Sequence, residues 1–222
     1  MKNSPLYIIL FFAHFSIAQT PVVNSKFMTT SESDHFLSDS TKHLLKINSP
    51  VLYLNNYSDK SGNYYTVFTQ RTIAEYADKD SLPNSIRFLN LELKSGKLIS
   101  VWDKEINALP DFISGTQTIN FNKDLISFSD LDNDSLIDPV ISYTTNTKCD
   151  IIVFYQKKPF IVELILGNSG QETIYIDPAF YNLPFEIQKN VTDKLDILYA
   201  IKPAEFPDGW KNAIQKKKTI IK

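Results

Sequence analysis

The stretch Leu125–Thr144, LISFSDLDNDSLIDPVISYT, decides the fold class that we expect for the chain. Apolar and polar side chains alternate over Leu125–Ser129, and Pro139–Thr144 is rich in β-branched and aromatic residues. Both flanks are predicted to be strands, because these patterns are typical of a pleated, half-buried surface. The acidic residues between the flanks predict a loop, so the whole stretch is expected to form a hairpin.

The loop Asp130–Asp138 places carboxylates at relative positions 1, 3, 5 and 9. At this spacing a short loop can surround a hard cation with oxygen ligands. The sequence therefore predicts a structural calcium site. Its expected ligands are the side chains of Asp130, Asp132, Asp134 and Asp138 and the carbonyl oxygen of Leu136.

This loop resembles the strand–loop–strand calcium hairpins of the integrin-type and related repeat families. An EF-hand would instead have helices on both sides and Glu at position 12, where this chain has Ile141. At position 6, where the backbone needs a positive φ, Ser135 replaces the usual glycine, which costs roughly 1 kcal/mol. The alternative is a hairpin rich in Asx turns that holds no ion, in which the carboxylates repel one another uncompensated.

Strand patterns recur in pairs on both sides of this stretch, and short turn segments join the members of each pair. Successive hairpins predict an antiparallel meander rather than a parallel βαβ sheet. The predicted pairs are Val51–Leu54 with Tyr64–Thr69, Ile86–Leu93 with Leu98–Trp102, and Ile151–Tyr155 with Phe160–Leu166.

The apolar period changes to that of a helix after Asp177. We expect a helical segment over about residues 178–218, with a short last helix that begins at Trp210. Phe206–Trp210 interrupts the helical pattern and is expected to fold its aromatic rings onto the sheet as packing contacts. The predicted fold class is therefore α+β, mainly an antiparallel β meander, with C-terminal helices packed on or beside the sheet.

The N-terminal residues 1–18 are typical of a secretory signal peptide, with Lys2, a short apolar core and small residues before Gln19. An uncleaved anchor is the alternative. Residues 19–48 are predicted to be a polar, loosely ordered leader with a short helical turn near Thr41–Leu45. Residues 49–222 then form a single β-rich domain. We expect an exported protein, in the periplasm, on the outer-membrane surface or secreted, that is soluble after cleavage and has no transmembrane segment.

The formal net charge of −2 at pH 7 argues against a nucleic-acid partner or an anionic membrane surface. The only cysteine, Cys149, excludes a disulfide within the chain. No base near it is evident in the sequence, so we interpret Cys149 as a buried thiol rather than a nucleophile. The stability of an exported chain of this kind must come from its core, with a contribution from a bound ion.

Three segments of the chain occur in an order that is informative together. They are DKSGN at 59–63 followed by Thr69, FSDLDND at 128–134, and AFYNLP at 179–184 with FPDGW at 206–210. In this order they resemble a family of exported proteins of Gram-negative bacteria that are described as surface polysaccharide biosynthesis proteins. The resemblance covers most of residues 50–218, and it implies an association with lipopolysaccharide or other surface glycans without supplying catalytic residues. The chain departs from the family at Ser135 and in having a single cysteine where some relatives have a pair.

Three functions remain open from the sequence. The preferred one is a non-catalytic envelope protein that binds or organises a surface glycan or an envelope protein, with calcium bracing the hairpin. A glycan hydrolase would need paired carboxylates, for which Asp103, Glu105 and Asp111 are the candidates. A structural envelope protein would bind no small ligand. An exposed aromatic groove without a convergent acid–base pair would favour the first.

Overall fold

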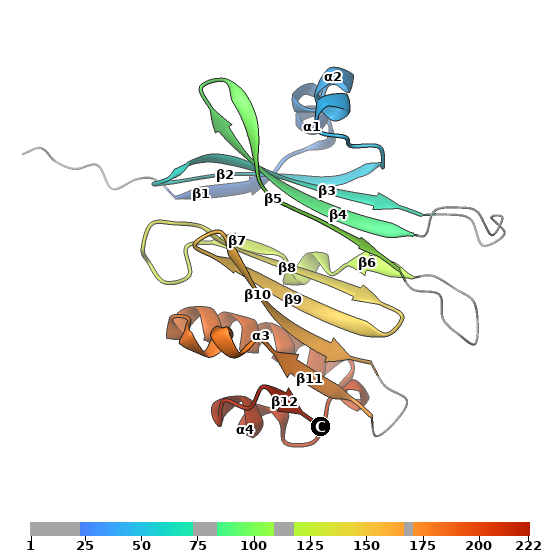
Figure 1. Cartoon of the computed structure of the whole chain (residues 1–222), viewed down its shortest axis with the longest axis vertical. Coiled ribbons are helices and arrows are strands. Elements are labelled where there is room, and N and C mark those ends of the chain that lie inside the picture. The colour runs from blue at the N-terminus through green and yellow to red at the C-terminus, as the bar shows by residue number, and fades with distance from the viewer. Residues whose placement is uncertain (1–22, 73–83, 109–117, 167–170) are drawn as a thin grey trace, which may run out of the picture.

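The computed structural model describes residues 23–72, 84–108, 118–166 and 171–222. The predicted signal peptide and Asp111 lie outside these residues. In the described part the chain forms two antiparallel sheets that are stacked as layers, with helices on the outer side of each (Figure 1). None of the described helices combines the length and the apolar composition needed to cross a bilayer.

The first sheet has the strand order β1-β2-β3-β4-β5, so each strand lies beside its neighbour in the chain. Hairpins β2–β3 and β4–β5 confirm the first two predicted pairs. The strands are β1 Asn24–Phe27, β2 Val51–Asp59, β3 Gly62–Arg71, β4 Ser85–Lys94 and β5 Lys97–Asn107.

The second sheet has the order β12-β11-β10-β9-β8-β6, and β7 also pairs with β8. The antiparallel meander predicted from the sequence is confirmed, but its division between two sheets was not predicted. The strands are β6 Ile119–Phe121, β7 Ser127–Ser129, β8 Asp138–Thr145, β9 Lys148–Tyr155, β10 Lys158–Ile165, β11 Thr173–Ile176 and β12 Ile220–Ile221, with the 3₁₀ helix η1 at Lys123–Leu125.

The space between the sheets is filled by a core to which both sheets contribute. Phe68 and Phe88 come from the first sheet, and Ile141 and Phe154 come from the second. Phe154 stacks on Trp102 of β5 with ring centroids 4.1 Å apart. Because aromatic rings dominate the energetics of such cores, this layer holds the two sheets face to face.

The outer face of the second sheet is covered by the C-terminal helices (Figure 1). Ile187, Val191 and Leu195 recur at helical spacing and pack against this sheet. Phe206 and Trp210 are buried there with ring centroids 5.2 Å apart, which confirms the packing role expected for Phe206–Trp210. The elements are η2 Pro178–Asn182, α3 Phe185–Ile201, η3 Pro203–Glu205 and α4 Trp210–Gln215.

Residues 23–48, where the sequence predicted a polar, loosely ordered leader with a short helical turn near Thr41–Leu45, hold one strand and two short helices, the second of which overlaps the predicted turn. Strand β1 pairs with β2, and the helices α1 (Thr30–Phe36) and α2 (Asp39–Leu44) follow it. A reciprocal capping box between Thr29 and Glu32 starts α1. Leu37 and Ile47 pack onto the outer face of the first sheet. The polar composition obscured these features, because a few apolar residues are enough to dock two short helices.

Candidate metal centre

The acidic loop connects β7 to β8, and the pairing of these strands decides which carboxylates meet. Ser129 lies opposite Asp138 in the ladder, and Phe128 lies opposite Pro139. Asp130 therefore follows immediately after β7, and Asp138 stands at the first position of β8. The first and last acidic residues of the loop are brought together by the hairpin itself.

Carboxylate oxygens of Asp130, Asp132 and Asp138 lie within 4.8 Å of one another. The structure thus brings together three of the four predicted side-chain ligands. Asp134 points elsewhere: its Oδ1 accepts a hydrogen bond from the Leu136 amide (2.7 Å), and its Oδ2 lies 3.8 Å from Lys60 Nζ. No contact of the described structure places the Leu136 carbonyl in the group.

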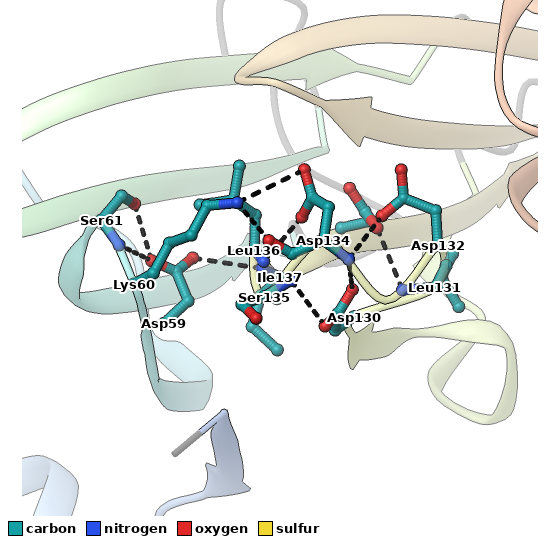
Figure 2. A network of polar contacts seen from close by, with 11 residues as sticks. Asp59, Lys60, Ser61, Asp130, Leu131, Asp132, Asp134, Ser135, Leu136 and Ile137 are labelled. Atoms are coloured by element: carbon teal, nitrogen blue, oxygen red, sulfur yellow. Dashed lines mark hydrogen bonds and ion pairs between the residues drawn. The ribbon is translucent and has the colours of Figure 1, made fainter. Parts of the chain in front are cut away.

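Hydrogen bonds from backbone amides to these carboxylates shape the loop (Figure 2). Asp130 accepts from the amides of Asp134 (3.0 Å) and Ser135 (2.8 Å), and Asp138 accepts from Leu131 (3.1 Å). The Asx turns of the alternative, in which a side chain accepts from the amide two residues on, occur at Asp132 with the Asp134 amide (3.3 Å) and at Asp134 with the Leu136 amide. The same oxygen atoms are the predicted ion ligands, so the two interpretations share one geometry.

The backbone of the loop is left-handed at two positions that are not glycine. Asn133 has φ 61° and Ser135 has φ 67°. The conformation expected at position 6 is therefore present, and serine adopts it in place of glycine. Asparagine tolerates this region better than serine, because its side chain can hydrogen-bond locally. Ser135 is accordingly a strained point in the loop.

The pKa of Asp138 is raised to about 7, first by burial and then by repulsion from the carboxylates of Asp132, Asp134 and Asp130, against the lowering effect of the hydrogen bond from the Leu131 amide. Asp138 is only 2% exposed. Without a cation, a carboxyl group in this place holds its proton far more tightly than in water. A bound cation would remove this repulsion, and the oxygen atoms present are those that a hard cation such as calcium prefers.

The turn of the β2–β3 hairpin docks onto the acidic loop (Figure 2). Asp59 Oδ2 accepts from the Ile137 amide (3.1 Å), while Oδ1 holds its own turn through the Ser61 amide (2.7 Å). The Lys60 amide donates to the Ser135 carbonyl (3.1 Å), and Lys60 Nζ donates to the Asp134 carbonyl. Two segments far apart in sequence therefore form one unit that joins the two sheets.

A pocket of about 220 Å³ lies beside this unit, between the two sheets. Two stacked aromatic pairs contribute to its lining, Tyr57 with Tyr64 (centroids 4.9 Å apart) and Trp102 with Phe154. Ile137 of the acidic loop lines it as well. Sequence reasoning missed this pocket, because its walls come from both sheets and the sequence predicted only one.

Of the candidate hydrolase residues, Asp103 and Glu105 lie within the described residues, and each has an arginine partner. Asp103 forms a two-pronged ion pair with Arg87, with Nε–Oδ1 2.8 Å and Nη2–Oδ2 2.7 Å, and Glu105 lies 3.7 Å from Arg71. Both acids are exposed on β5, and neither lines the pocket. Cys149 is buried, and burial raises the pKa of its thiol, which opposes a nucleophilic role.

Sequence reasoning also missed a buried polar row across the second sheet. Tyr143, Asp150 and Glu163 occupy facing positions on β8, β9 and β10. Lys148 Nζ lies 3.0 Å from Asp150 Oδ2 and also donates to Glu163, and the Tyr143 hydroxyl donates to Asp150. Only the strand register brings these residues together, so no sequence motif announces them.

No protein-family model, curated protein or solved structure matches this chain. The carboxylate cluster, the docked turn and the adjoining pocket are therefore interpreted from their own geometry.

Proposed function

We propose that the protein is an exported, non-catalytic protein of the cell envelope that acts in the production or display of surface polysaccharide and holds a structural calcium ion. One observation carries the proposal. The acidic loop, which is suited to a hard cation, also lines an aromatic pocket that contains no acid–base pair.

The calcium part is supported by the chemistry of the loop. Asp130, Asp132 and Asp138 present oxygen atoms from three carboxylates in a small volume, and one of these is almost fully buried. Calcium accepts such ligands in irregular geometry and completes its coordination with carbonyl oxygens or water. The ion would brace the hairpin against the repulsion that raises the pKa of Asp138.

We propose that the pocket is not catalytic because of the hydrogen bonds that its carboxylate, Asp59, already makes. Asp59 is the only carboxylate among the described residues that line the pocket, and its two oxygens accept hydrogen bonds from the amides of Ser61 and Ile137. Glycoside hydrolysis needs a second carboxyl group across the scissile bond. The described pocket has none, so binding is favoured over cleavage. The link to surface polysaccharide comes from the family resemblance.

The calcium part is tested by thermal unfolding of the protein purified after expression of the full chain, in EDTA and in millimolar calcium. Asp132→Asn is the informative variant, because within the loop Asp132 accepts one long hydrogen bond, from the Asp134 amide (3.3 Å), and its other partner is the Tyr155 hydroxyl. The amide oxygen of asparagine can accept both hydrogen bonds, so the variant removes the charge and leaves the loop in place. We expect calcium to raise the midpoint by several degrees, since saturation at about 100 Kd stabilises by roughly 2.7 kcal/mol. The shift should vanish in Asp132→Asn.

Asp124→Asn is the matched control, because Asp124 is an exposed acid in η1 and makes no contact with the loop. A midpoint that calcium does not move, or one that it moves equally in both variants, would contradict a calcium site. The polysaccharide part is tested separately by comparing the surface glycans of a bacterial strain with and without the gene. If the amount, length distribution and display of these glycans do not change, the polysaccharide part of the proposal is contradicted and the calcium part is unaffected.

A further inference from the structure

We propose that the pocket between the two sheets binds a single sugar ring, with Trp102, Tyr57 and Lys157 as its contacts. The inference rests on the proposed function for the source of the sugar, a surface glycan. It does not depend on whether the acidic loop holds an ion. The argument uses the size of the pocket, its aromatic wall and the polar groups at its mouth.

The size of the pocket limits the ligand to one ring. Its volume of about 220 Å³ is below the roughly 300–1,000 Å³ of pockets that bury drug-sized molecules. A polymer could enter only through one residue, with the rest of the chain outside. The walls come from β2, β3, β4 and β5 on one side and from β9 and the acidic loop on the other.

The aromatic wall offers an apolar face to the ligand. Trp102 is only partly buried, whereas its stacking partner Phe154 is 4% exposed, and both rings line the pocket. One side of a pyranose ring carries axial C–H groups and is apolar, while hydroxyl groups surround its edge. Such a ring can therefore lie against an aromatic side chain and still present its hydroxyls to polar groups.

Polar groups stand where those hydroxyls would lie. The Tyr57 hydroxyl accepts a hydrogen bond from Asn90 Nδ2 (2.9 Å), which leaves its own proton for a further acceptor. The exposed Gln156 and Lys157 line the mouth, and Lys157 Nζ lies 5.3 Å from the centre of the Tyr64 ring. An amide, a hydroxyl and an ammonium group beside an aromatic wall suit a ligand with several hydroxyl groups.

The turn that carries Gln156 and Lys157 is strained. These two residues connect β9 to β10 with φ 50° and 66°, the left-handed values that two-residue hairpin turns usually give to Asn-Gly. Strain of this kind persists where the surrounding structure imposes it, and it concentrates at ligand clamps. The presence of two long polar side chains at these strained positions fits contacts with a ligand.

The test is a titration by saturation-transfer NMR of the purified full-chain product in calcium. The probes are the methyl β-pyranosides of glucose, galactose and N-acetylglucosamine, with phenol as a ring of similar size that lacks the hydroxyl pattern. We expect at least one glycoside to bind. Lys157→Ala should weaken it about tenfold, the effect of losing one hydrogen bond to a charged group. Lys158→Ala, the neighbouring exposed lysine that does not line the pocket, should leave the affinity within about twofold of the original.

Two further variants separate binding from folding. Trp102→Leu should abolish the signal, and circular dichroism shows whether that variant is still folded. Lys157→Gly relieves the left-handed strain, so it should weaken binding without lowering the unfolding midpoint. No binding of any glycoside, equal binding by all variants, or a response to phenol alone would overturn the pocket proposal.

Repeating the titration in EDTA distinguishes this proposal from the proposed function. Glycoside binding that persists in EDTA supports the pocket, even if the calcium-dependent rise in the unfolding midpoint is absent. A calcium-dependent midpoint without glycoside binding would overturn the pocket and leave the ion site standing. Glycoside binding without any change in surface glycans on loss of the gene would support the pocket and contradict its assigned source.

Discussion

At the scale of single residues, the loop combines a stable scaffold with one costly position. The carboxylates of Asp130 and Asp138 accept hydrogen bonds from backbone amides and so hold the loop closed. Ser135, in contrast, takes a left-handed conformation that costs an L-residue about 1 kcal/mol or more. The side chain of Ser135 makes no hydrogen bond among the described residues. Its strain is therefore not offset by a contact of its own.

Ser135→Gly should stabilise the protein by about 0.5–1 kcal/mol, because glycine adopts φ 67° without steric cost. Urea unfolding in EDTA measures the change without interference from an ion. Ser129→Gly is the control, since Ser129 lies in the extended strand β7, where glycine should destabilise by a similar amount. Equal destabilisation by both substitutions would show that the loop is not strained at Ser135.

The sequence predicted three acidic residues that meet, together with a fourth that does not, and it did not show what holds them. Spacing alone brought Asp130, Asp132 and Asp138 into one expected site, because a hairpin loop dictates its own geometry. Asp59 escaped detection, since its hydrogen bond to the Ile137 amide depends on how two distant hairpins dock. Asp134 was assigned as a ligand from its position in the sequence. In the structure its carboxylate instead accepts a hydrogen bond from the Leu136 amide and lies near the Lys60 ammonium group.

At the scale of elements, hairpins were predictable and their assembly was not. The strands of β2–β3, β4–β5 and β9–β10 carry long apolar patterns that end at turn residues, so each pair could be read locally. β12 has two residues, too few for any pattern. The alternation of apolar and polar residues shows that a strand has one apolar and one polar face, but it does not show what covers each face. One continuous sheet and two stacked sheets therefore predict the same sequence pattern.

Helix α3 carries a charge on the face that packs against the second sheet. Lys194 is 8% exposed and lies beside the buried Val191 and Leu195 in the chain. Burial lowers the pKa of its ammonium group, which forms no ion pair among the described residues. The buried charge therefore opposes folding at neutral pH, when the group is protonated in both the folded and the unfolded chain.

Lys194→Met should raise the unfolding midpoint at pH 7 by about 2–4 °C, the shift expected for roughly 1 kcal/mol in a chain of this length. The advantage should shrink as pH rises through the lowered folded pKa toward the usual value of about 10.5, because the folded state then releases the proton first and gains stability. Lys189→Met, at an exposed position of the same helix, is the control, and it should change the midpoint little at either pH. A difference between wild type and Lys194→Met that grows with pH would contradict this account.

At the scale of the whole molecule, the docked turn connects the ion site, the pocket and both sheets. Asp59 belongs to the first sheet, Ile137 lies next to Asp138 of the carboxylate cluster, and both Asp59 and Ile137 line the pocket. The hydrogen bond between them joins the first sheet to the backbone segment that carries Asp138. A substitution in the acidic loop should therefore also change how the two sheets pack against each other.

This connection predicts that Asp59→Asn and Asp132→Asn are coupled in calcium. Loss of Asp59 loosens the loop at Ile137, so the ion should contribute less stability when both are changed. A double-mutant cycle by urea unfolding should give an interaction of about 0.5–3 kcal/mol, the range for residues in one hydrogen-bonded network. Asp59→Asn with Asp193→Asn is the comparison, because Asp193 lies on the exposed surface of α3 and pairs with Lys189. That pair should be additive within about 0.5 kcal/mol, whereas additivity in both cycles would mean that the turn and the acidic loop act independently.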